Sequence, residues 1–277
     1  NWNVDNDDYF GEDSREWDMI PDVGIGRFPV DTNAELQNMI NKHIAYQTSP
    51  VNEDIQKGLL VGEILNNDPY TPGANYMEQL EGYSSANGYQ TQGYDESFTV
   101  DKLYDHYGDW SIYDLKNKIL TGTHLLMHLG HSFTDYNMKM NNYDISNNFF
   151  STSDGENHLN FIVNTQGCYP GSFDNRGTSE GSYFPDDSFA EKMVYLEKGA
   201  VAYIANSRYG WYHPGGTNSS SQRFQRYFMD EIYAQGNYSI GDILSASKAR
   251  SMQTGGYTGS MLWCYYEINL FGDPSFM

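Results

Sequence analysis

The sequence predicts an α/β fold in which a mostly parallel sheet carries helices on both faces. Apolar runs of strand length alternate along the chain with segments of helical periodicity, and strands that are separated by helices usually pair in parallel. The run at 58–62 is continuously apolar, which is typical of a strand buried on both faces. The chain has 277 residues, of which 16% are aromatic, so it can bury a large core and needs no disulfides or structural metal to fold.

Each element has its own local signal. The helix after Thr32 begins with a capping-box pattern, in which Glu35 follows the cap by three residues, and its apolar residues recur at helical spacing. Gly122 and Gly199 end two later helices. The predicted strands are 23–28, 58–62, 125–129, 159–163 and 200–204, and the other predicted helices cover roughly 74–86, 112–120, 187–198, 219–235 and 240–252.

The charge balance narrows the range of partners. Asp and Glu number 37 against 16 Lys and Arg, which gives a formal net charge of −21. Nucleic acid and anionic membranes repel such a chain, whereas cations are favoured. No apolar run approaches the length of a spanning helix, so direct membrane insertion is not expected. Abundant Asn, Tyr and Gly with few basic residues indicate a secreted or cell-surface protein.

Two predicted strands end in residues that can do chemistry together. His131 follows the strand at 125–129, and Cys168 follows the strand at 159–163. If these strands are neighbours in a parallel sheet, the two side chains lie at one edge as a nucleophile and its base. Gly130 and Gly167 would let the backbone approach a substrate closely, and nearby N–H groups would stabilise an oxyanion.

Other interpretations of these residues stay open. His128 lies within the predicted strand and is more typical of a packed histidine whose tautomer is fixed. Cys168 and Cys264 are the two cysteines of the chain, and they could form a disulfide or remain separate thiols. A catalytic Cys168 should have a lowered pKa and react quickly with alkylating agents, whereas a buried structural thiol should not.

A series of short blocks resembles the gingipain family, peptidase family C25, among the caspase-like cysteine peptidases of clan CD. The blocks agree with the family in order and approximate spacing over nearly the whole chain. They are Ile-Gly-Arg-Phe at 25–28, Leu-Gly-His-Ser at 129–132, the segments 161–168, 189–191 and 199–204, and Gly-Asp-Pro-Ser at 272–275. The resemblance implies a caspase/gingipain-like sheet with helices on both faces.

The resemblance also implies roles for particular residues. His131 and Cys168 would be catalytic, and Glu63 would orient the imidazole, as the third member of a triad does; a solvated carboxylate is the alternative for Glu63. Trp211 matches a tryptophan that lines the family's substrate pocket, although a structural tryptophan is equally compatible with its place in a loop.

The chain departs from the family pattern around the substrate pocket. Ser132 stands where the family usually has glycine, so the oxyanion site would have a different shape. Asn75 falls near the pocket aspartate of the Arg-specific members, and Pro214 falls where the Lys-specific members have an acidic residue. Neither preference for a basic residue is therefore supported. Together with Gly130, Gly167 and Trp211, Ser132 and Asn75 form the predicted substrate-binding set.

The acidic start of the chain suggests a structural Ca²⁺ site, because carboxylates are the ligands that calcium prefers. The family's calcium binding adds to this expectation, although the spacing does not fit an EF-hand and a solvated acidic surface is the alternative. The candidate ligands are Asp5, Asp7, Asp8, Asp18 and Asp22.

For the domain organisation, we expect residues 1–62 to be the remainder of a first α/β subdomain whose N-terminal part is absent, and residues 63–277 to be the caspase-like catalytic subdomain. In the full-length protein, the missing N-terminal segment and a C-terminal immunoglobulin-like domain would flank this chain.

The sequence thus favours an extracellular cysteine endopeptidase that cleaves protein or peptide substrates through a Cys–His dyad and a thioester. The alternatives are a catalytically inactive gingipain-like surface, assembly or binding protein and a transpeptidase relative.

Overall fold

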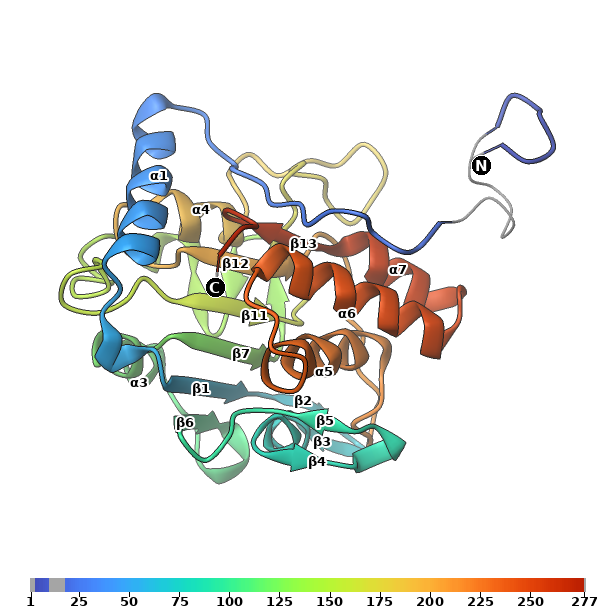
Figure 1. Ribbon diagram of the computed structural model, residues 1–277, viewed down its shortest axis with the longest axis horizontal. Coiled ribbons are helices and arrows are strands. Elements are labelled where there is room, and N and C mark those ends of the chain that lie inside the picture. Colours follow the sequence, from blue (N-terminus) through green and yellow to red (C-terminus); the bar gives the residue numbers. More distant parts are fainter. Residues whose placement is uncertain (1–2, 10–17, 277) are drawn as a thin grey trace.

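A six-stranded sheet forms the centre of the molecule (Figure 1) in a computed structural model that describes residues 3–9 and 18–276. The strands from β12 to β6 run parallel, and β13 pairs antiparallel with β12 at one edge. This arrangement confirms the predicted mostly parallel sheet. In spatial order the strands are β13 (Ile268–Phe271), β12 (Ala202–Asn206), β11 (Ile162–Thr165), β7 (Leu125–Leu129), β1 (Lys57–Gly62) and β6 (Thr99–Tyr104).

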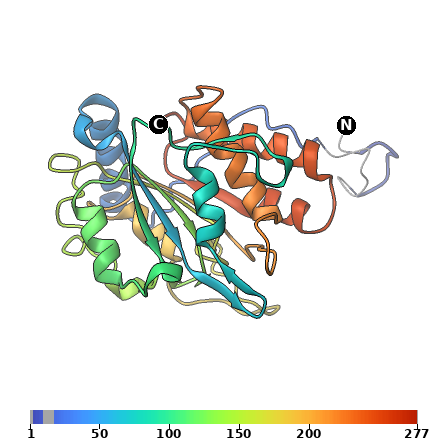
Figure 2. The same ribbon diagram turned by 90° about the horizontal axis from the view of Figure 1, so that it is seen from below.

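Helices cover both faces of this sheet (Figure 2). One face packs against the later helices and α2, and the opposite face packs against α1, α3 and α4. The helices are α1 (Asn33–Thr48), α2 (Ala74–Met77), α3 (Ile112–Leu120), α4 (Phe189–Tyr195), α5 (Ser220–Tyr233), α6 (Ile240–Gly255) and α7 (Gly259–Glu267).

Three small antiparallel sheets lie in the segments that connect the strands of the central sheet. They are the pair β2 (Ile64–Asn67) and β3 (Tyr70–Pro72), the pair β4 (Tyr83–Ser84) and β5 (Thr91–Gln92), and the three-stranded sheet of β8 (Ser132–Phe133), β9 (Tyr136–Asn137) and β10 (Met140–Asn141). The last of these begins directly after His131, so it belongs to the surroundings of the predicted site.

Strand β1 illustrates why apolar runs end up in the centre. Leu60 packs with the cluster beneath α5 and α6, whereas Leu59 and Val61 pack with the cluster beneath α3 and α4. Successive side chains of a strand point to opposite faces, so a strand covered on both sides needs apolar residues throughout. All three side chains are fully buried.

The first helix begins where its capping box predicts. The Thr32 hydroxyl accepts the backbone N–H of Glu35, and the Glu35 carboxylate accepts the backbone N–H of Thr32 in return. These bonds satisfy donors that a helix leaves free at its start.

Two predicted elements are wrong. The strand at 23–28 is reduced to a single bridge between Arg27 and Phe271, where the chain crosses the sheet edge so closely that a Cβ on Gly26 would lie 2.0 Å from the carbonyl oxygen of Gly272. The helix at 74–86 ends after α2 and a single 3-10 turn at Glu78–Leu80. Gly82 then adopts a φ of 64°, which turns the chain into β4.

Other boundaries differ by a few residues, and several elements were missed. Strand β11 begins three residues later than predicted and α4 is shorter at both ends. The elements that were not predicted include two strands of the central sheet, β6 and β13, the helix α7 and the short strands of the three small sheets. The half-exposed edge strand β6 has mixed polarity, so it lacks the continuous apolar signal of its neighbours.

The boundary proposed between residues 62 and 63 falls at the end of β1. Both sheet neighbours of β1, β6 and β7, come later in the chain, so this strand is part of the same sheet as the segment after it. A separate first subdomain upstream stays a prediction. Among residues 3–9 and 18–276, no helix is both long enough and apolar enough to cross a membrane.

Candidate functional site

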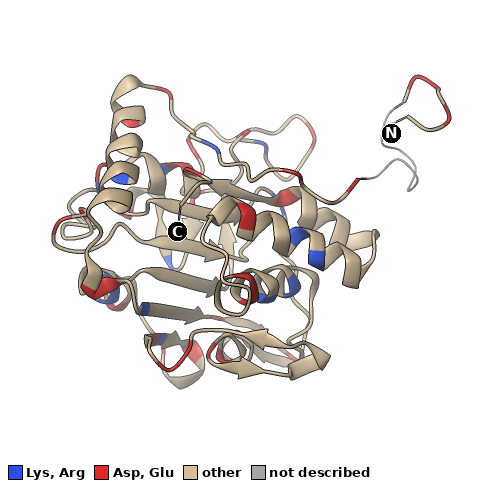
Figure 3. Ribbon diagram, in the orientation of Figure 1, with Lys and Arg blue, Asp and Glu red and all other residues tan. Residues whose placement is uncertain are grey.

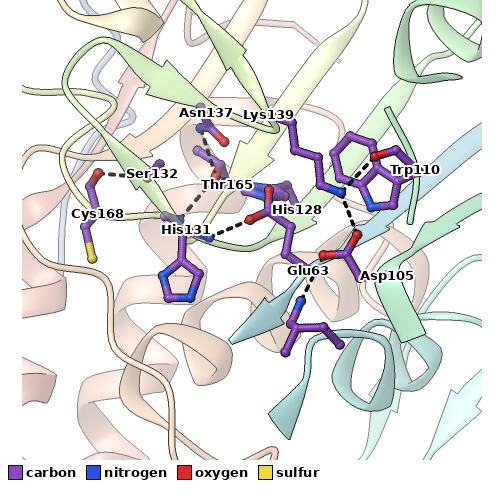
Figure 4. Close-up of polar contacts among 12 residues, drawn as sticks. Glu63, Asp105, Trp110, His128, His131, Ser132, Asn137, Lys139, Thr165 and Cys168 are labelled. Atoms are coloured by element: carbon purple, nitrogen blue, oxygen red, sulfur yellow. Dashed lines mark hydrogen bonds and ion pairs between the residues drawn. The ribbon is translucent and has the colours of Figure 1, made fainter. Parts of the chain in front are cut away.

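Three central strands deliver polar residues to one edge of the sheet. Glu63 follows β1, His131 follows β7 and Cys168 follows β11. These strands are parallel neighbours, so their carboxyl ends meet at the same edge, where α/β sheets usually bind ligands. Figure 4 shows the His131 ring and the Cys168 sulfur pointing to the same side of this edge.

The imidazole of His131 is oriented by a backbone group. Its Nε2 lies 3.1 Å from the carbonyl oxygen of Leu65 in β2. A carbonyl oxygen only accepts hydrogen bonds, so Nε2 carries the proton and donates it to Leu65. In the neutral ring Nδ1 is then the unprotonated nitrogen, which can take a proton from a thiol.

The carboxylate of Glu63 contacts the backbone of His131 rather than its ring. Its Oε2 accepts the backbone N–H of His131 at 3.0 Å, and its Oε1 lies 3.3 Å from Nε2 of His128. The expected contact with the imidazole of His131 is therefore replaced by one that holds the loop, and the solvated alternative is wrong because Glu63 is buried. Sequence patterns give no signal for the carbonyl of Leu65 that takes over the orienting role.

The surroundings of Cys168 favour its neutral thiol over the thiolate. Burial raises the pKa of this thiol, and the charge of ionised Glu267 raises it further. The thiol contacts the carbonyl oxygen of Gly210, which lies 3.6 Å from Sγ. This direction is opposite to the lowered pKa expected of a reactive cysteine. A base must therefore remove the proton when the sulfur attacks. The backbone N–H of Cys168 donates to no acceptor in the part of the chain that the structure describes, so it is free to meet an oxyanion.

The two cysteines are free thiols, which excludes the disulfide between Cys168 and Cys264. Cys264 is fully buried in α7, with its sulfur 3.4 Å from the hydroxyl oxygen of Ser221. Burial raises the pKa of its thiol to about 12. This cysteine therefore behaves as a small core residue and offers a matched comparison for Cys168.

The predicted glycines make close contacts with protein groups. A Cβ on Gly130 would lie 2.3 Å from Nε2 of His128 and 2.4 Å from Cδ of Glu63. Since real Cβ atoms do not approach other atoms so closely, only glycine lets this loop pack against the buried Glu63 and His128. The side chains of His128 and Glu63, and not a substrate, therefore occupy the space beside Gly130.

Ser132 ties the histidine loop to the cysteine loop. Its hydroxyl donates to the carbonyl oxygen of Cys168 at 2.7 Å. A Cβ on Gly167 would lie 1.9 Å from the same hydroxyl oxygen, so a serine at 132 requires glycine at 167. The departure from the family's usual glycine thus changes what joins the two loops.

Asn75 and Trp211 come from segments that lie beside each other. Asn75 is exposed on α2, and its carbonyl accepts the side-chain N–H of Gln79, which also bonds the hydroxyl of Thr217. Trp211 is 41% exposed and directly follows Gly210, whose carbonyl faces the Cys168 sulfur. Trp211 therefore lies next to the Cys168 loop, and the role of both residues in substrate binding stays a prediction.

A cavity of about 430 Å³ lies beside the cysteine loop. Its wall residue Arg208 accepts the backbone N–H of Tyr169 through its carbonyl, which places the cavity next to Cys168. Its lining combines the apolar side chains of Leu262, Trp263 and Tyr266 with polar groups. Among the residues that the structure describes, none gives a hydrogen bond to the two carboxylate oxygens of Glu267. Burial raises the pKa of Glu267 to about 8. The lining residues are Ser207, Arg208, Gly259, Leu262, Trp263, Tyr266 and Glu267.

The predicted calcium ligands do not converge within the described residues. Residues 3–9 form a loop that projects away from the body and contains acidic residues (Figure 3). Asp7 accepts the backbone N–H of Tyr9, and Asp18 accepts that of Ile20. No group of three or more His, Cys, Asp or Glu side chains suited to a metal occurs in residues 3–9 and 18–276. Asp13 and Glu16, two further acidic residues that are close in sequence to Asp18 and could contribute ligands, lie outside the described residues.

Fold and site together define an α/β protein that presents a thiol and an imidazole at the carboxyl edge of a parallel sheet. A model of peptidase family C25 matches residues 2–277, and the chain belongs to this family. The resemblance seen in the sequence is therefore confirmed. No curated protein was matched by the sequence.

Solved structures share the fold. The crystal structure of the Arg-specific cysteine proteinase gingipain R (RgpB) aligns with a TM-score of 0.69 at 17% identity, covering 94% of this chain and 56% of that one. The complex of the Porphyromonas gingivalis RgpB pro- and mature domains gives a TM-score of 0.68 at 17% identity, covering 94% and 57%. A further structure, described as a protease, gives 0.54 at 18% identity, covering 90% and 54%. The gingipain-like fold class is confirmed, and the chain spans a little over half the length of these relatives.

Proposed function

We propose that this chain is the catalytic part of a cysteine endopeptidase. The observation that carries the proposal is the meeting of His131 and Cys168 at one sheet edge, within a chain of peptidase family C25. The hydrogen bond from His131 Nε2 to Leu65 supports it, because it leaves Nδ1 as the nitrogen that accepts a proton.

In the proposed reaction, Nδ1 of His131 takes the proton of Cys168 as the sulfur attacks the carbonyl carbon of the scissile peptide bond. The oxyanion that forms accepts the backbone N–H of Cys168. When the C–N bond breaks, His131 returns the proton to the leaving amine and a thioester remains. Water, deprotonated by His131, then attacks the thioester and releases the acid and the thiol; an amine in place of water would give transpeptidation.

A peptide library tests this proposal with wild type, Cys168→Ala and Cys264→Ala. We expect the first substitution to abolish turnover and the second to leave kcat within roughly a factor of two, because Cys264 is a fully buried core residue that takes no part in the proposed reaction. Equal turnover by wild type and Cys168→Ala would refute the assignment. Mass analysis of the products with and without an added peptide amine separates hydrolysis from transpeptidation.

A second candidate is a non-catalytic surface or assembly protein that retains the fold. The raised pKa of Cys168 favours it, because an unreactive thiol needs no activation. Absence of turnover on every peptide, together with slow alkylation of Cys168 at all pH values where the fold is intact, would support this candidate.

We also propose secretion or cell-surface location, supported by the abundant Asn, Tyr and Gly with few basic residues, and calcium binding, supported by the acidic composition. Protein or peptide substrates follow from the proposed reaction. Fractionation of the native cells with an antibody against this chain tests the location.

A further inference from the structure

A fully buried histidine lies behind the candidate dyad. His128 is 0% exposed, with Nδ1 2.7 Å from the hydroxyl oxygen of Thr165 and Nε2 3.3 Å from Oε1 of Glu63 (Figure 4). The register of β7 and β11 pairs His128 with Thr165, so the contact is set by the sheet itself. The proposed reaction makes no use of this ring.

The surroundings of Thr165 determine which nitrogen of His128 carries the proton. The hydroxyl oxygen of Thr165 lies 3.2 Å from both the backbone N–H of Gly167 and the side-chain N–H of Asn137. A hydroxyl oxygen has two lone pairs, and these two donors use both of them. Its own hydrogen must therefore point to Nδ1 of His128, which leaves Nε2 protonated and donating to Glu63.

This tautomer links the two loops of the site. Glu63, bonded to Nε2 of His128, holds the backbone N–H of His131 through its other oxygen. Thr165, bonded to Nδ1, holds the backbone N–H of Gly167, the residue before Cys168. One neutral imidazole, donating on one side and accepting on the other, thus connects the supports of both proposed catalytic residues.

We propose that His128 is a positioning residue, which through Glu63 and Thr165 keeps the His131 and Cys168 loops in a fixed relative geometry. This inference rests on the proposed function. Small displacements of two reacting groups lower the reaction rate strongly. Loss of the contact of His128 with either Glu63 or Thr165 should therefore lower kcat much more than it raises KM.

The contact of His128 with Glu63 and its contact with Thr165 can be removed separately. His128→Gln keeps a side-chain N–H at the distance of Nε2 but loses the acceptor for Thr165, whereas His128→Asn keeps an acceptor near Nδ1 but loses the donor to Glu63. Thr165→Val removes the hydroxyl at similar volume, and Thr165→Ser restores it. We expect kcat to fall roughly 10- to 100-fold in His128→Gln, His128→Asn and Thr165→Val, with KM within about threefold of the wild-type value. Thr165→Ser should retain most of the activity.

Two measurements do not depend on turnover. Peptide-level mass analysis gives the rate at which iodoacetamide alkylates Cys168 as a function of pH, and we expect its profile to shift in folded His128→Gln and Thr165→Val but not in Thr165→Ser. A purely structural role would lower the melting temperature and leave this profile unchanged. Nitrogen-15 NMR of histidine-labelled wild type should show His128 protonated at Nε2 and unprotonated at Nδ1, whether or not any variant folds.

These outcomes distinguish the two proposals. If wild type lacks peptidase turnover but the alkylation profiles shift as expected, the proposed function fails and the positioning role stands. If wild type is active and folded His128→Gln and Thr165→Val match its kcat and alkylation profile, the positioning role is overturned and the peptidase proposal stands. An NMR spectrum with both ring nitrogens protonated, or with Nδ1 protonated, overturns the tautomer and the link built on it.

Discussion

At the scale of single residues, the groups around the candidate dyad are held mainly by main-chain contacts. Leu65 orients the imidazole through its carbonyl, and Glu63 holds the loop of His131 through a backbone N–H. Backbone atoms are positioned by the strands they belong to, so the rigid sheet fixes the site more firmly than long side chains would.

The buried carboxyl of Glu267 should make stability depend on pH. Burial raises the pKa of this group to about 8 from 4.5, and nearby Arg208 opposes the shift only in part. Between these values the folded protein keeps a proton that the unfolded chain loses, so the contribution of Glu267 to stability declines as pH rises from about 4.5 to 8. At pH 8, Glu267→Gln should therefore be more stable than wild type, whereas near pH 4.5 the two should agree.

Denaturant unfolding at several pH values between these limits measures the difference, with Glu96→Gln as the exposed control. Wild type and Glu267→Gln curves that run parallel across the range would show that the carboxyl ionises normally in the fold.

The close contact between Gly167 and Ser132 predicts a rescue. Gly167→Ala places a methyl group on the hydroxyl of Ser132 and should cost about 1–3 kcal/mol of stability. Adding Ser132→Gly removes the obstruction, because the next heavy atom near this Cβ position is the Gly130 carbonyl oxygen at 3.5 Å. The double variant should therefore recover most of the loss, and a double-mutant cycle of unfolding free energies should show coupling above about 0.5 kcal/mol. Additive losses would mean that the loops separate easily.

At the scale of elements, the small sheet of β8, β9 and β10 is anchored by one lysine. Lys139 donates to Asp105, Asp109 and the carbonyl of Trp110, and it lies over the Trp110 ring (Figure 4). Asp105 also accepts the backbone N–H of Ile64, next to Glu63. The anchor therefore connects the segment after His131 with the segment that carries Glu63.

Lys139→Met should cost about 2 kcal/mol of stability, because it leaves Asp105, a half-buried carboxylate, without its cation. The matched control is Lys118→Met, which removes an ion pair with Asp101 in which both side chains are well exposed and should cost no more than about 0.5 kcal/mol. Thermal unfolding of both variants gives the comparison. Equal losses would show that the small sheet does not depend on this anchor.

At the scale of the whole molecule, the net charge of −21 is the dominant feature. Acidic residues are scattered along the ribbon and include residues of the loop at 3–9 (Figure 3). Such a charge opposes compaction through self-repulsion and attracts cations, which is the physical basis for expecting a calcium effect.

We expect millimolar Ca²⁺ to raise the melting temperature by several degrees more than Mg²⁺ at equal ionic strength, since carboxylate sites of flexible geometry prefer the larger ion. A triple variant, Asp5→Asn with Asp7→Asn and Asp8→Asn, should lose this difference, as measured by differential scanning calorimetry. An unchanged calcium response in the triple variant would exclude these residues as the ligands.

The sequence predicted the sheet and both members of the candidate dyad, because those signals are local. The apolar strand at 58–62 and the residues His131 and Cys168 after their strands are visible in a short window. Strand β6 was missed because it lies at the edge and is only partly buried, and the helix predicted at 74–86 fails at Gly82, where the backbone turns.

By itself, the sequence determined the alternation of strands and helices, four of the six strands of the central sheet, the strand ends that carry a thiol and an imidazole, and membership of a peptidase family. Only the tertiary structure decided that Leu65 orients His131, that His128 bridges Glu63 and Thr165, and that Glu267 is buried beside Cys168. These contacts join residues far apart in the chain. They depend on strand register and side-chain direction, which the spacing of apolar residues along the sequence does not specify.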